Sequence, residues 1–346
     1  MKDIQSHRKD EHVSLAEHFY QPQSEAGFQH IRLLPNALPE INQKQVSLNS
    51  QMGGIFTDFP FYIEAMTGGS AYTGKLNASL ARIAKATHLP MAVGSQSIAL
   101  REPSLRETFQ IVREINPDGL IIANIGANHS PVAAQEAVDM IQADLLEVHV
   151  NAIQEMIMPE GDREFNWLQN IGEIVKHVSV PVIVKEVGFG MTKEAMQSLQ
   201  AVGVQFINVA GHGGTNFAKI ENARRHDKAY DYLQDLGLTT VESLLESQAL
   251  QDSLTIYACG GIRTPLDMLK GFALGANMIG IAGTVLHSLL RNGENDTITL
   301  ITNWQSQLKD LLTIQGAQTI QQLNAKNLIF DESLSHYCRQ RQIKLL

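Results

Sequence analysis

Residues 145–162 read LLEVHVNAIQEMIMPEGD, an apolar run that changes within a few residues into a series of polar side chains. His149, Asn151, Gln154 and Glu155 follow the run, and an acidic turn ends the stretch. In parallel α/β proteins, polar groups that come directly after a buried strand lie where ligands bind. This segment by itself predicts either a site for a charged ligand or, with equal support, a polar loop that caps a helix.

The same pattern of a short apolar run, then Gly or polar residues, then a helical period, occurs eight times along the chain. The runs are FYIEAMTGG from Phe61, MAVGSQS from Met91, LIIANIGAN from Leu120, the stretch from Leu145, VPVIVKEVG from Val180, FINVAGHGG from Phe206, TIYACGG from Thr255 and MIGIAGT from Met278. Strands that are buried on both faces read as continuous apolar runs. Eight of them, each followed by a helix, predict an α/β fold, a closed parallel (β/α)8 TIM barrel. An open, doubly wound sheet is the alternative.

The 346 residues are predicted to form one barrel domain. A prior of roughly one domain per 150 residues would allow two domains, but α/β barrels often exceed this length as one unit. Residues 1–55 have little periodicity and form an N-terminal arm, and residues 216–250 form an insertion after the sixth strand. The charged cluster at residues 7–12 is expected either to be solvated or to fold over a pocket and supply cations.

The composition excludes several classes of function. A hydrophobic fraction of 44% with 18% charged residues is typical of a soluble globular protein, and the formal net charge of −9 argues against general nucleic-acid or membrane-surface binding. The N-terminus has no apolar core and cannot be a signal peptide. Cys259 and Cys338 have no metal-ligand spacing, so a reduced, cytoplasmic setting is expected. The uncharged residues 271–290 are interrupted by glycines and predict a helix end, a strand and a turn rather than a membrane span.

The ends of the last three apolar runs predict a phosphate site. The sixth run ends in Gly213-Gly214-Thr215, the seventh in Gly260-Gly261-Ile262-Arg263 and the eighth in Ala282-Gly283-Thr284. Glycines at strand ends let backbone N–H groups approach a phosphate, and barrels often bind phosphate after strands seven and eight. Ordinary tight turns are the alternative.

Lys185 ends the fifth run, where a buried lysine needs either a partner or a function. It would form a Schiff base, place a positive charge beside a cofactor ring, or pair with Glu186 or another strand-end acid. The first three runs end in small or amide-bearing groups that fit the edge of a flat heteroaromatic ring. Together with the phosphate site, these groups indicate FMN; they are Met66, Thr67, Gly68, Ser95 and Asn124.

The complete set of motifs closely resembles the type 2 isopentenyl-diphosphate isomerases, which hold FMN in a (β/α)8 barrel. The motifs extend from Arg8 to about Gly283 and are RKDEH from Arg8, MTGG, GSQ, HVNAIQEMIMPEGD, VKEVGFGM, GGTNFAKIE and GGIR. The chain departs from the family pattern at three positions. His212 lies at a variable position, Cys259 replaces a common Ser, and Ser97 replaces a frequent basic residue, although Arg101 is close enough in sequence to supply charge.

The resemblance implies interconversion of isopentenyl and dimethylallyl diphosphate, with reduced FMN as the acid–base group, Mg2+, and NADPH as a transient reductant. FMN would contact Met66, Thr67, Gly68, Ser95, Asn124, Lys185, Thr215, Gly260, Gly261, Ile262, Arg263, Ala282 and Gly283. The substrate would contact Arg8, Lys9, Ser95, Gln96, Arg101, His149, Asn151 and Gln154. Catalytic roles would fall to Gln154, which positions the reacting carbon, and to Lys185, which stabilises the anionic ring.

A diphosphate in a cavity of low dielectric needs cations and a hard divalent ion. The resemblance assigns that ion to Glu155, and one carboxylate is sufficient because Mg2+ keeps several waters. The resemblance also implies a homo-oligomer, either a tetramer or an octamer.

Three other functions compete with this one. An FMN-dependent hydroxy-acid oxidase is one, because His212-Gly213-Gly214 resembles its catalytic His-Gly segment, but Thr215 and Asn216 stand where a carboxylate-binding Arg would follow. A Schiff-base aldolase that uses Lys185 is the second, and a noncatalytic flavin- or phosphate-binding protein is the third.

Overall fold

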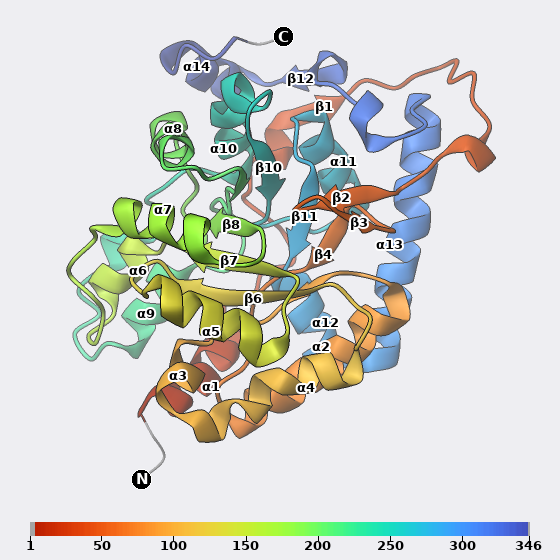
Figure 1. The fold of residues 1–346 in the computed structure, drawn as a ribbon. Helices are drawn as coiled ribbons and strands as arrows, with labels where there is room; N and C mark the ends of the chain where they lie inside the picture. The colour runs from red at the N-terminus through yellow and green to blue at the C-terminus, as the bar shows by residue number, and fades with distance from the viewer. Residues whose placement is uncertain (1–3, 345–346) are drawn as a thin grey trace.

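A computed structural model describes residues 4–344, and its centre is a closed barrel of eight parallel strands (Figure 1). The strands are β4 (Phe61–Ile63), β5 (Met91–Ala92), β6 (Ile121–Gly126), β7 (Leu145–His149), β8 (Val182–Lys185), β9 (Phe206–Asn208), β10 (Thr255–Ala258) and β11 (Met278–Ile281). Neighbouring strands follow one another in sequence, and β11 closes the barrel by pairing with β4. The predicted (β/α)8 barrel is confirmed, and the open sheet is wrong.

The strand register brings polar strand ends to one edge of the barrel. His149 on β7 lies beside Gly126 on β6 and Lys185 on β8, and Lys185 lies beside Asn208 on β9. These residues are far apart in sequence, and parallel pairing aligns them because every strand runs toward the same end. The polar ends of the runs therefore form one rim.

Helices surround the barrel where the sequence predicted them. They are α2 (Ala71–Thr87), α4 (Glu107–Ile115), α5 (Pro131–Ile141), α7 (Trp167–His177), α8 (Lys193–Ala201), α10 (Thr240–Ser247), α11 (Pro265–Ala273) and α12 (Gly283–Asn292). Local signals define several starts: Ser70 caps α2 by accepting a bond from the Thr73 N–H at 3.0 Å, and Thr264 caps α11 directly before Pro265. Residues 271–290 contain the end of α11, β11 and most of α12, as predicted.

The opposite end of the barrel is filled by apolar side chains. A hairpin of β2 (Ser50–Met52) and β3 (Ile55–Thr57) covers this end, and the Gly53 N–H donates to the Tyr257 hydroxyl at 2.8 Å. A buried layer inside the barrel consists of Met52, Tyr62, Ala92, Ile122, Leu145, Ile183, Tyr257 and Met278. These side chains fill the barrel at the amino ends of its strands. Space for a ligand is therefore left at the carboxyl ends.

The N-terminal arm is folded against the barrel. Its helix α1 (Ile4–His18) crosses near the carboxyl ends of the strands, and Val13 is buried. Farther along, β1 (Ile31–Leu33) pairs antiparallel with β12 (Leu328–Phe330) near the C-terminus. The expectation of a solvated cluster is therefore wrong for Arg8 and His12, whose side chains are 17% and 18% exposed.

The remaining elements belong to loops, the insertion and the C-terminal region. They are α3 (Ser97–Arg101), α6 (Ala152–Ile157), α9 (Phe217–Arg224), α13 (Glu294–Gln315) and α14 (Glu332–Gln340), with short 3-10 helices η1 (Phe28–His30), η2 (Gln43–Gln45), η3 (Pro103–Leu105), η4 (Asp231–Leu233), η5 (Gln248–Leu250), η6 (Ile320–Gln322) and η7 (Ala325–Asn327). The predicted insertion contains α9, η4 and α10, and α9 packs on α6. No helix within residues 4–344 is long and apolar enough to cross a membrane.

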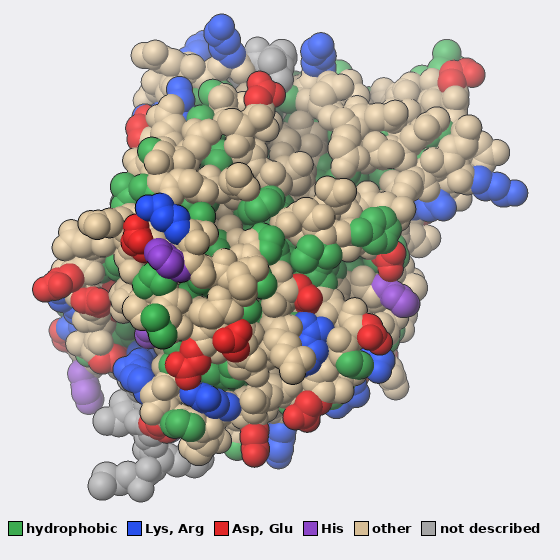
Figure 2. Space-filling model, viewed as in Figure 1, with side chains coloured by type: hydrophobic (Ala, Val, Ile, Leu, Met, Phe, Trp, Pro, Cys, Tyr) green, Lys and Arg blue, Asp and Glu red, His purple; other side chains and the backbone are tan. Residues whose placement is uncertain are grey.

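Acidic and basic side chains are interspersed over the lower part of the face shown in Figure 2. A nucleic-acid-binding surface needs an extended patch of basic side chains. This face has no such patch, in agreement with the negative net charge.

Candidate active site

A cavity of about 510 Å3 lies at the carboxyl ends of the barrel strands, below α1. Every barrel strand or the turn that follows it contributes to the lining. The structure brings together these sequence-predicted residues: Arg8, Lys9, Met66, Ser95, Arg101, Asn124, His149, Asn151, Gln154, Glu155, Lys185, Thr215, Gly260, Gly261, Ile262, Arg263, Ala282 and Gly283. The volume is in the range of small-molecule and cofactor sites.

Three predicted site residues do not line this cavity. Gln96 is fully buried in the barrel wall, where its Oε1 accepts from the Asn124 N–H at 3.0 Å and its Nε2 donates to the Ala137 carbonyl at 2.8 Å. Thr67 donates its hydroxyl to Asn77, and Gly68 packs against the Phe109 ring. The polar groups of Gln96 and Thr67 already have partners within the wall, and contacts of these three residues with substrate or FMN stay predictions.

One end of the cavity is built from backbone. Gly260 and Gly261 have φ of +96° and +70°, a region that strongly favours glycine. A Cβ on Gly214 would lie 2.5 Å from the Gly261 nitrogen, so the turns after β9 and β10 pack closely on each other. Helix α12 begins at Gly283 beside them and adds a helix N-terminus, which favours anions.

Arg263 supplies the cation at this end. Its Nη1 donates to the Thr284 hydroxyl at 3.1 Å, and its guanidinium lies 4.6 Å from the centre of the Tyr20 ring. The Nε of Arg263 is among the buried side-chain nitrogens of the described residues that have no hydrogen-bond partner. Burial lowers the pKa of Arg263. An anion at the glycine turns would supply both a partner and a compensating charge, so the site fits the phosphate of FMN.

Lys185, at the end of β8, lines the cavity and is 6% exposed. Its ammonium donates to the Glu186 carbonyl at 3.0 Å and lies 3.9 Å from Glu64 Oε2. Burial alone would lower the pKa of Lys185, but the neighbouring Cys259 and acidic groups, Glu64 first among the carboxylates, raise it above its ordinary value. A Schiff-base lysine needs a lowered pKa, so this environment favours the alternative of a fixed positive charge beside a ring.

The other end of the cavity is built from cationic side chains. Lys9 on α1 donates to the Ser95 carbonyl at 3.1 Å, and Arg8 lies 3.4 Å from Glu160. Burial, then Arg8 and Arg101, lowers the pKa of Lys9 to about 7. A buried lysine beside two arginines is stabilised by an anion of high charge. This end therefore fits a diphosphate.

His149 is held by a chain of hydrogen bonds that joins β6 and β7. Asn124 donates its Nδ2 to Glu147 Oε2 at 3.0 Å, which leaves its Oδ1 to face His149 Nδ1 at 2.9 Å. Nδ1 is then the donor, and Nε2 is the nitrogen that remains for a ligand. Burial, followed by the charges of Lys185 and Lys9, lowers the pKa of His149 to about 3.

Glu155 supplies a carboxylate to the same end of the cavity. Its Oε1 accepts from Asn151 at 3.0 Å, and its Oε2 accepts from the Asp162 N–H at 2.7 Å. Within residues 4–344 there is no group of three His, Cys, Asp or Glu side chains that could hold a metal ion. The site therefore fits a cation such as Mg2+ that takes one protein carboxylate and fills its other positions with water and substrate phosphate.

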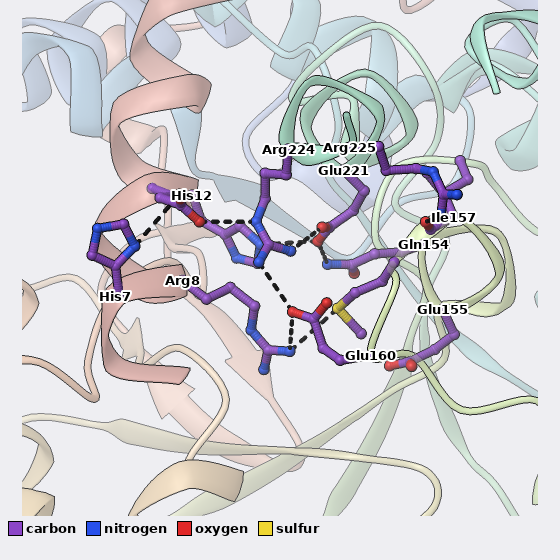
Figure 3. A network of polar contacts seen from close by, with 12 residues as sticks. His7, Arg8, His12, Gln154, Glu155, Ile157, Glu160, Glu221, Arg224 and Arg225 are labelled. Carbon is purple, nitrogen blue, oxygen red and sulfur yellow. Dashed lines mark hydrogen bonds and ion pairs between the residues drawn. The ribbon is translucent and has the colours of Figure 1, made fainter. Parts of the chain in front are cut away.

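A polar network that the site prediction omitted holds Gln154 (Figure 3). Glu221 on α9 is fully buried; its Oε1 accepts from Gln154 Nε2 and faces His12 Nε2, both at 2.9 Å, and its Oε2 accepts from Arg224 at 2.5 Å. Although burial opposes ionisation, His12, Gln154 and Arg224 lower the pKa of Glu221 to about 2. The segment GGTNFAKIE, which ends at Glu221, was the sequence signal for this network.

The comparisons with known proteins agree with this geometry. Residues 95–330 match the family model of FMN-dependent dehydrogenases. Over 99% of both chains, the sequence is 52% identical to an isopentenyl-diphosphate delta-isomerase of Latilactobacillus sakei subsp. sakei. It is 44% identical to a protein of the same name from Staphylococcus aureus, over 100% of this chain and 99% of that one.

The chain belongs to the isopentenyl-diphosphate delta-isomerase family. The family resemblance in the sequence is thereby confirmed. Solved structures share the fold at low identity: a flavocytochrome b2 mutant with pyruvate bound has a TM-score of 0.70 and 19% identity, over 94% of this chain and 84% of that one. A mandelate oxidase variant has a TM-score of 0.64 and 16% identity, over 92% of each chain.

The three departures from the family pattern lie in different environments. His212 does not line the cavity, and its Nε2 lies 3.2 Å from the Gln234 carbonyl, so it is not placed as the base of a hydroxy-acid oxidase. Ser97 lines the cavity with its Oγ 2.9 Å from Ser95 Oγ. Cys259 lies 3.9 Å from Lys185 Nζ.

Proposed function

We propose that this protein interconverts isopentenyl diphosphate and dimethylallyl diphosphate, with reduced FMN and Mg2+, and that NADPH reduces the flavin. The observation that carries the proposal is the division of one cavity into two anion sites on either side of Lys185. Glycine turns with Arg263 form one site, and α1 cations with Glu155 form the other. Such a cavity suits a cofactor with one phosphate and a substrate with two.

FMN would be held by backbone at its phosphate and by side chains at its ring. The turns at Gly214, Gly260 and Gly283 bring N–H groups to the phosphate, while Met66, Ser95, Asn124 and Lys185 line the ring region. Reduced FMN supplies the proton donor and acceptor for the double-bond shift. The ammonium of Lys185 stabilises negative charge on the ring, because a preorganised charge in a buried site acts strongly.

Gln154 would position the reacting end of the substrate. An amide is a poor acid or base near neutral pH, so its role is steric and polar rather than proton transfer. Glu221 fixes its Nε2 at 2.9 Å. This bond to Glu221 on α9 fixes the orientation of the Gln154 amide, which lines the cavity. A fixed orientation holds the substrate in a reactive geometry.

The diphosphate would bind between α1 and the loop after β7. Arg8, Lys9 and Arg101 supply charge, His149 and Asn151 supply polar contacts, and Glu155 holds Mg2+. Helix α1 also covers the cavity, so bound substrate is shielded from water, which protects a reactive intermediate. The tetramer or octamer and the cytoplasmic setting remain predictions of the family resemblance.

An anaerobic assay with isopentenyl diphosphate, FMN, Mg2+ and NADPH, each omitted in turn, tests the proposal. We expect many product molecules per NADPH oxidised, since the reaction involves no net redox change, and no product without FMN or Mg2+. Dithionite should replace NADPH. Product formation without flavin would contradict the proposal. Stoichiometric flavin reduction by a 2-hydroxy acid without isomerisation would support the oxidase instead, and bound FMN without any turnover would support the noncatalytic alternative.

A further inference from the structure

Two carboxyl groups face a single tyrosine hydroxyl inside the barrel, next to Lys185. The Tyr62 hydroxyl lies 2.9 Å from Glu64 Oε2 and 3.2 Å from Glu147 Oε1. All three side chains are at most 2% exposed, and Asn208, also fully buried, completes the group. Two ionised carboxylates buried so close together would repel each other strongly. We therefore ask which of the two carboxyl groups is protonated.

The hydrogen bonds to Glu64 are those of an ionised carboxylate. Its Oε1 accepts from the Ala65 N–H at 2.8 Å, and its Oε2 accepts from Asn208 Nδ2 at 2.8 Å and from the Tyr62 hydroxyl. Lys185 Nζ lies 3.9 Å from the same Oε2. Several donors and one cation favour the charged form of this group.

Glu147 has fewer donors. Its Oε2 accepts from Asn124 Nδ2 at 3.0 Å, its Oε1 lies 3.2 Å from the Tyr62 oxygen, and its carboxyl group also contacts that of Glu64. Tyr62 has one hydroxyl proton, which the shorter distance directs to Glu64, and its oxygen accepts from Asn208 Nδ2 at 2.8 Å. An ionised Glu147 would therefore face a lone pair of Tyr62 and the charge of Glu64, whereas a protonated Glu147 can donate to either oxygen.

We propose that Glu147 is a buried neutral carboxylic acid and that Glu64 is the ionised group that sets the charge beside Lys185. The inference deepens the proposed function and rests on it only where it concerns the flavin. Burial, followed by the charge of Glu64, raises the pKa of Glu147 well above its usual range. Burial also raises the pKa of Tyr62, so the hydroxyl keeps its proton.

This assignment has a consequence for the flavin. Glu64 and Lys185 cancel each other's charge, and Glu147 adds none. Replacing Glu147 by Gln conserves shape and charge, whereas also replacing Glu64 by Gln leaves Lys185 without its counter-ion. More of the positive charge then acts on the ring, which stabilises its anionic reduced form. Glu64 and Glu147 are thus positioning residues that act through Lys185.

Infrared spectroscopy of the purified flavoprotein, labelled with 13C-glutamate, tests the proton assignment without reference to activity. We expect a carboxylic-acid C=O band at neutral pH that shifts with the label and loses intensity in Glu147→Gln; Glu186, whose pKa is raised by burial to about 7, accounts for any remainder. The absence of such a band from the unmodified protein, or an undiminished band in Glu147→Gln, would overturn the assignment. A Glu186→Gln variant that keeps the band distinguishes the two carboxyl groups even if Glu147→Gln does not fold.

The flavin midpoint potential tests the role of Glu64. We expect no change in Glu147→Gln. In the double variant Glu64→Gln/Glu147→Gln, we expect the preference for reduced over oxidised FMN to increase about tenfold. This corresponds to a rise of about 30 mV in the midpoint potential of a two-electron couple. The double variant is used because no proton can then move between the two groups. An altered potential in Glu147→Gln, or an unaltered one in the double variant, would overturn the role. If the infrared result holds and the potential does not move, the fault lies in placing FMN beside Lys185, that is, in the proposed function.

Discussion

The two ends of the cavity are built by different means. At the end formed by β10, β11 and α12, which we call the glycine end, close backbone contacts between Gly214, Gly260 and Gly261 shape the surface. At the end formed by α1, α6 and α9, which we call the cationic end, long side chains shape it. Arg224, for example, bridges to Glu11, which lies 213 residues away in sequence. The comparison indicates that ligand binding at the glycine end depends mainly on the shape of the backbone, and that ligand binding at the cationic end depends mainly on side-chain charge.

The two ends also differ in how their charges are compensated. Within the described residues, Arg263 at the glycine end and Arg8 at the cationic end each have a buried Nε without a partner, but at the glycine end backbone dipoles supply the rest of the anion site. At the cationic end, Arg8 and Arg101 lower the pKa of Lys9 beyond the effect of burial. Cofactor binding should therefore depend weakly on pH near neutrality, and substrate binding strongly.

The largest effect is expected from a side chain at the glycine end. In Gly260→Ala, the new Cβ would overlap the Gly211 carbonyl at a φ of +96°. We expect FMN affinity to fall at least about 100-fold, since the left-handed conformation alone costs roughly 1–2 kcal/mol and the overlap adds to it. Flavin fluorescence titration measures the affinity. Gly54→Ala is the control, because Gly54 also has a positive φ, of +85°, but has no atom within 4 Å of the added Cβ. Unchanged FMN binding in Gly260→Ala would refute the view that shape governs this end.

The next effect concerns the metal at the cationic end. In Glu155→Gln, we expect the Mg2+ concentration required for half-maximal activity to rise at least about tenfold, the lower bound for groups that support a metal. The flavin spectrum should not change, because Glu155 is at the other end of the cavity. Glu164→Gln, which alters an exposed acid nearby, is the matched control. Equal Mg2+ dependence in the two variants would remove Glu155 from the metal site.

The third effect is a pH dependence of substrate binding. Lys9 has a pKa of about 7 in the unliganded protein, so it is protonated below this pH and increasingly neutral above it. Only the protonated form attracts the diphosphate, so the substrate dissociation constant should increase up to about tenfold from pH 6 to pH 8. Lys9→Arg keeps its charge throughout and should have a flatter profile. Both proteins see the same ionisation of the substrate, so parallel profiles would contradict the role of Lys9.

The smallest effect is expected from the network that supports Gln154. Arg224→Gln removes a donor from buried Glu221 and a bridge to α1, so we expect substrate KM to increase roughly three- to tenfold, the scale of one ordinary hydrogen bond, since Glu221 keeps its contacts with Gln154 and His12. FMN affinity should stay the same. Arg225→Gln is the control, since the neighbouring Arg225 pairs with Asp227 instead. A loss of FMN binding in Arg224→Gln would show that the two ends are not independent.

Short stretches of sequence determined the barrel and the glycine end. Each strand is buried on both faces, so its local composition reveals it without knowledge of its neighbours. The glycine turns are equally local, because a positive φ at Gly260 or Gly261 depends on a few adjacent residues. The sequence therefore grouped Gly260, Gly261 and Gly283, which we predict to bind phosphate, and the structure brings them together in the cavity lining.

Only the tertiary structure decided which polar side chains face the cavity. Ser95 and Gln96 are adjacent, yet Ser95 lines the cavity, whereas the Gln96 side chain is buried in the wall, where it bonds to the backbone of Asn124 and Ala137. The position of α1 over the cavity likewise depends on contacts between residues far apart in sequence. The same is true of the proposed neutral state of Glu147 beside an ionised Glu64, since a carboxyl group's charge is set by the donors and charges that folding brings around it.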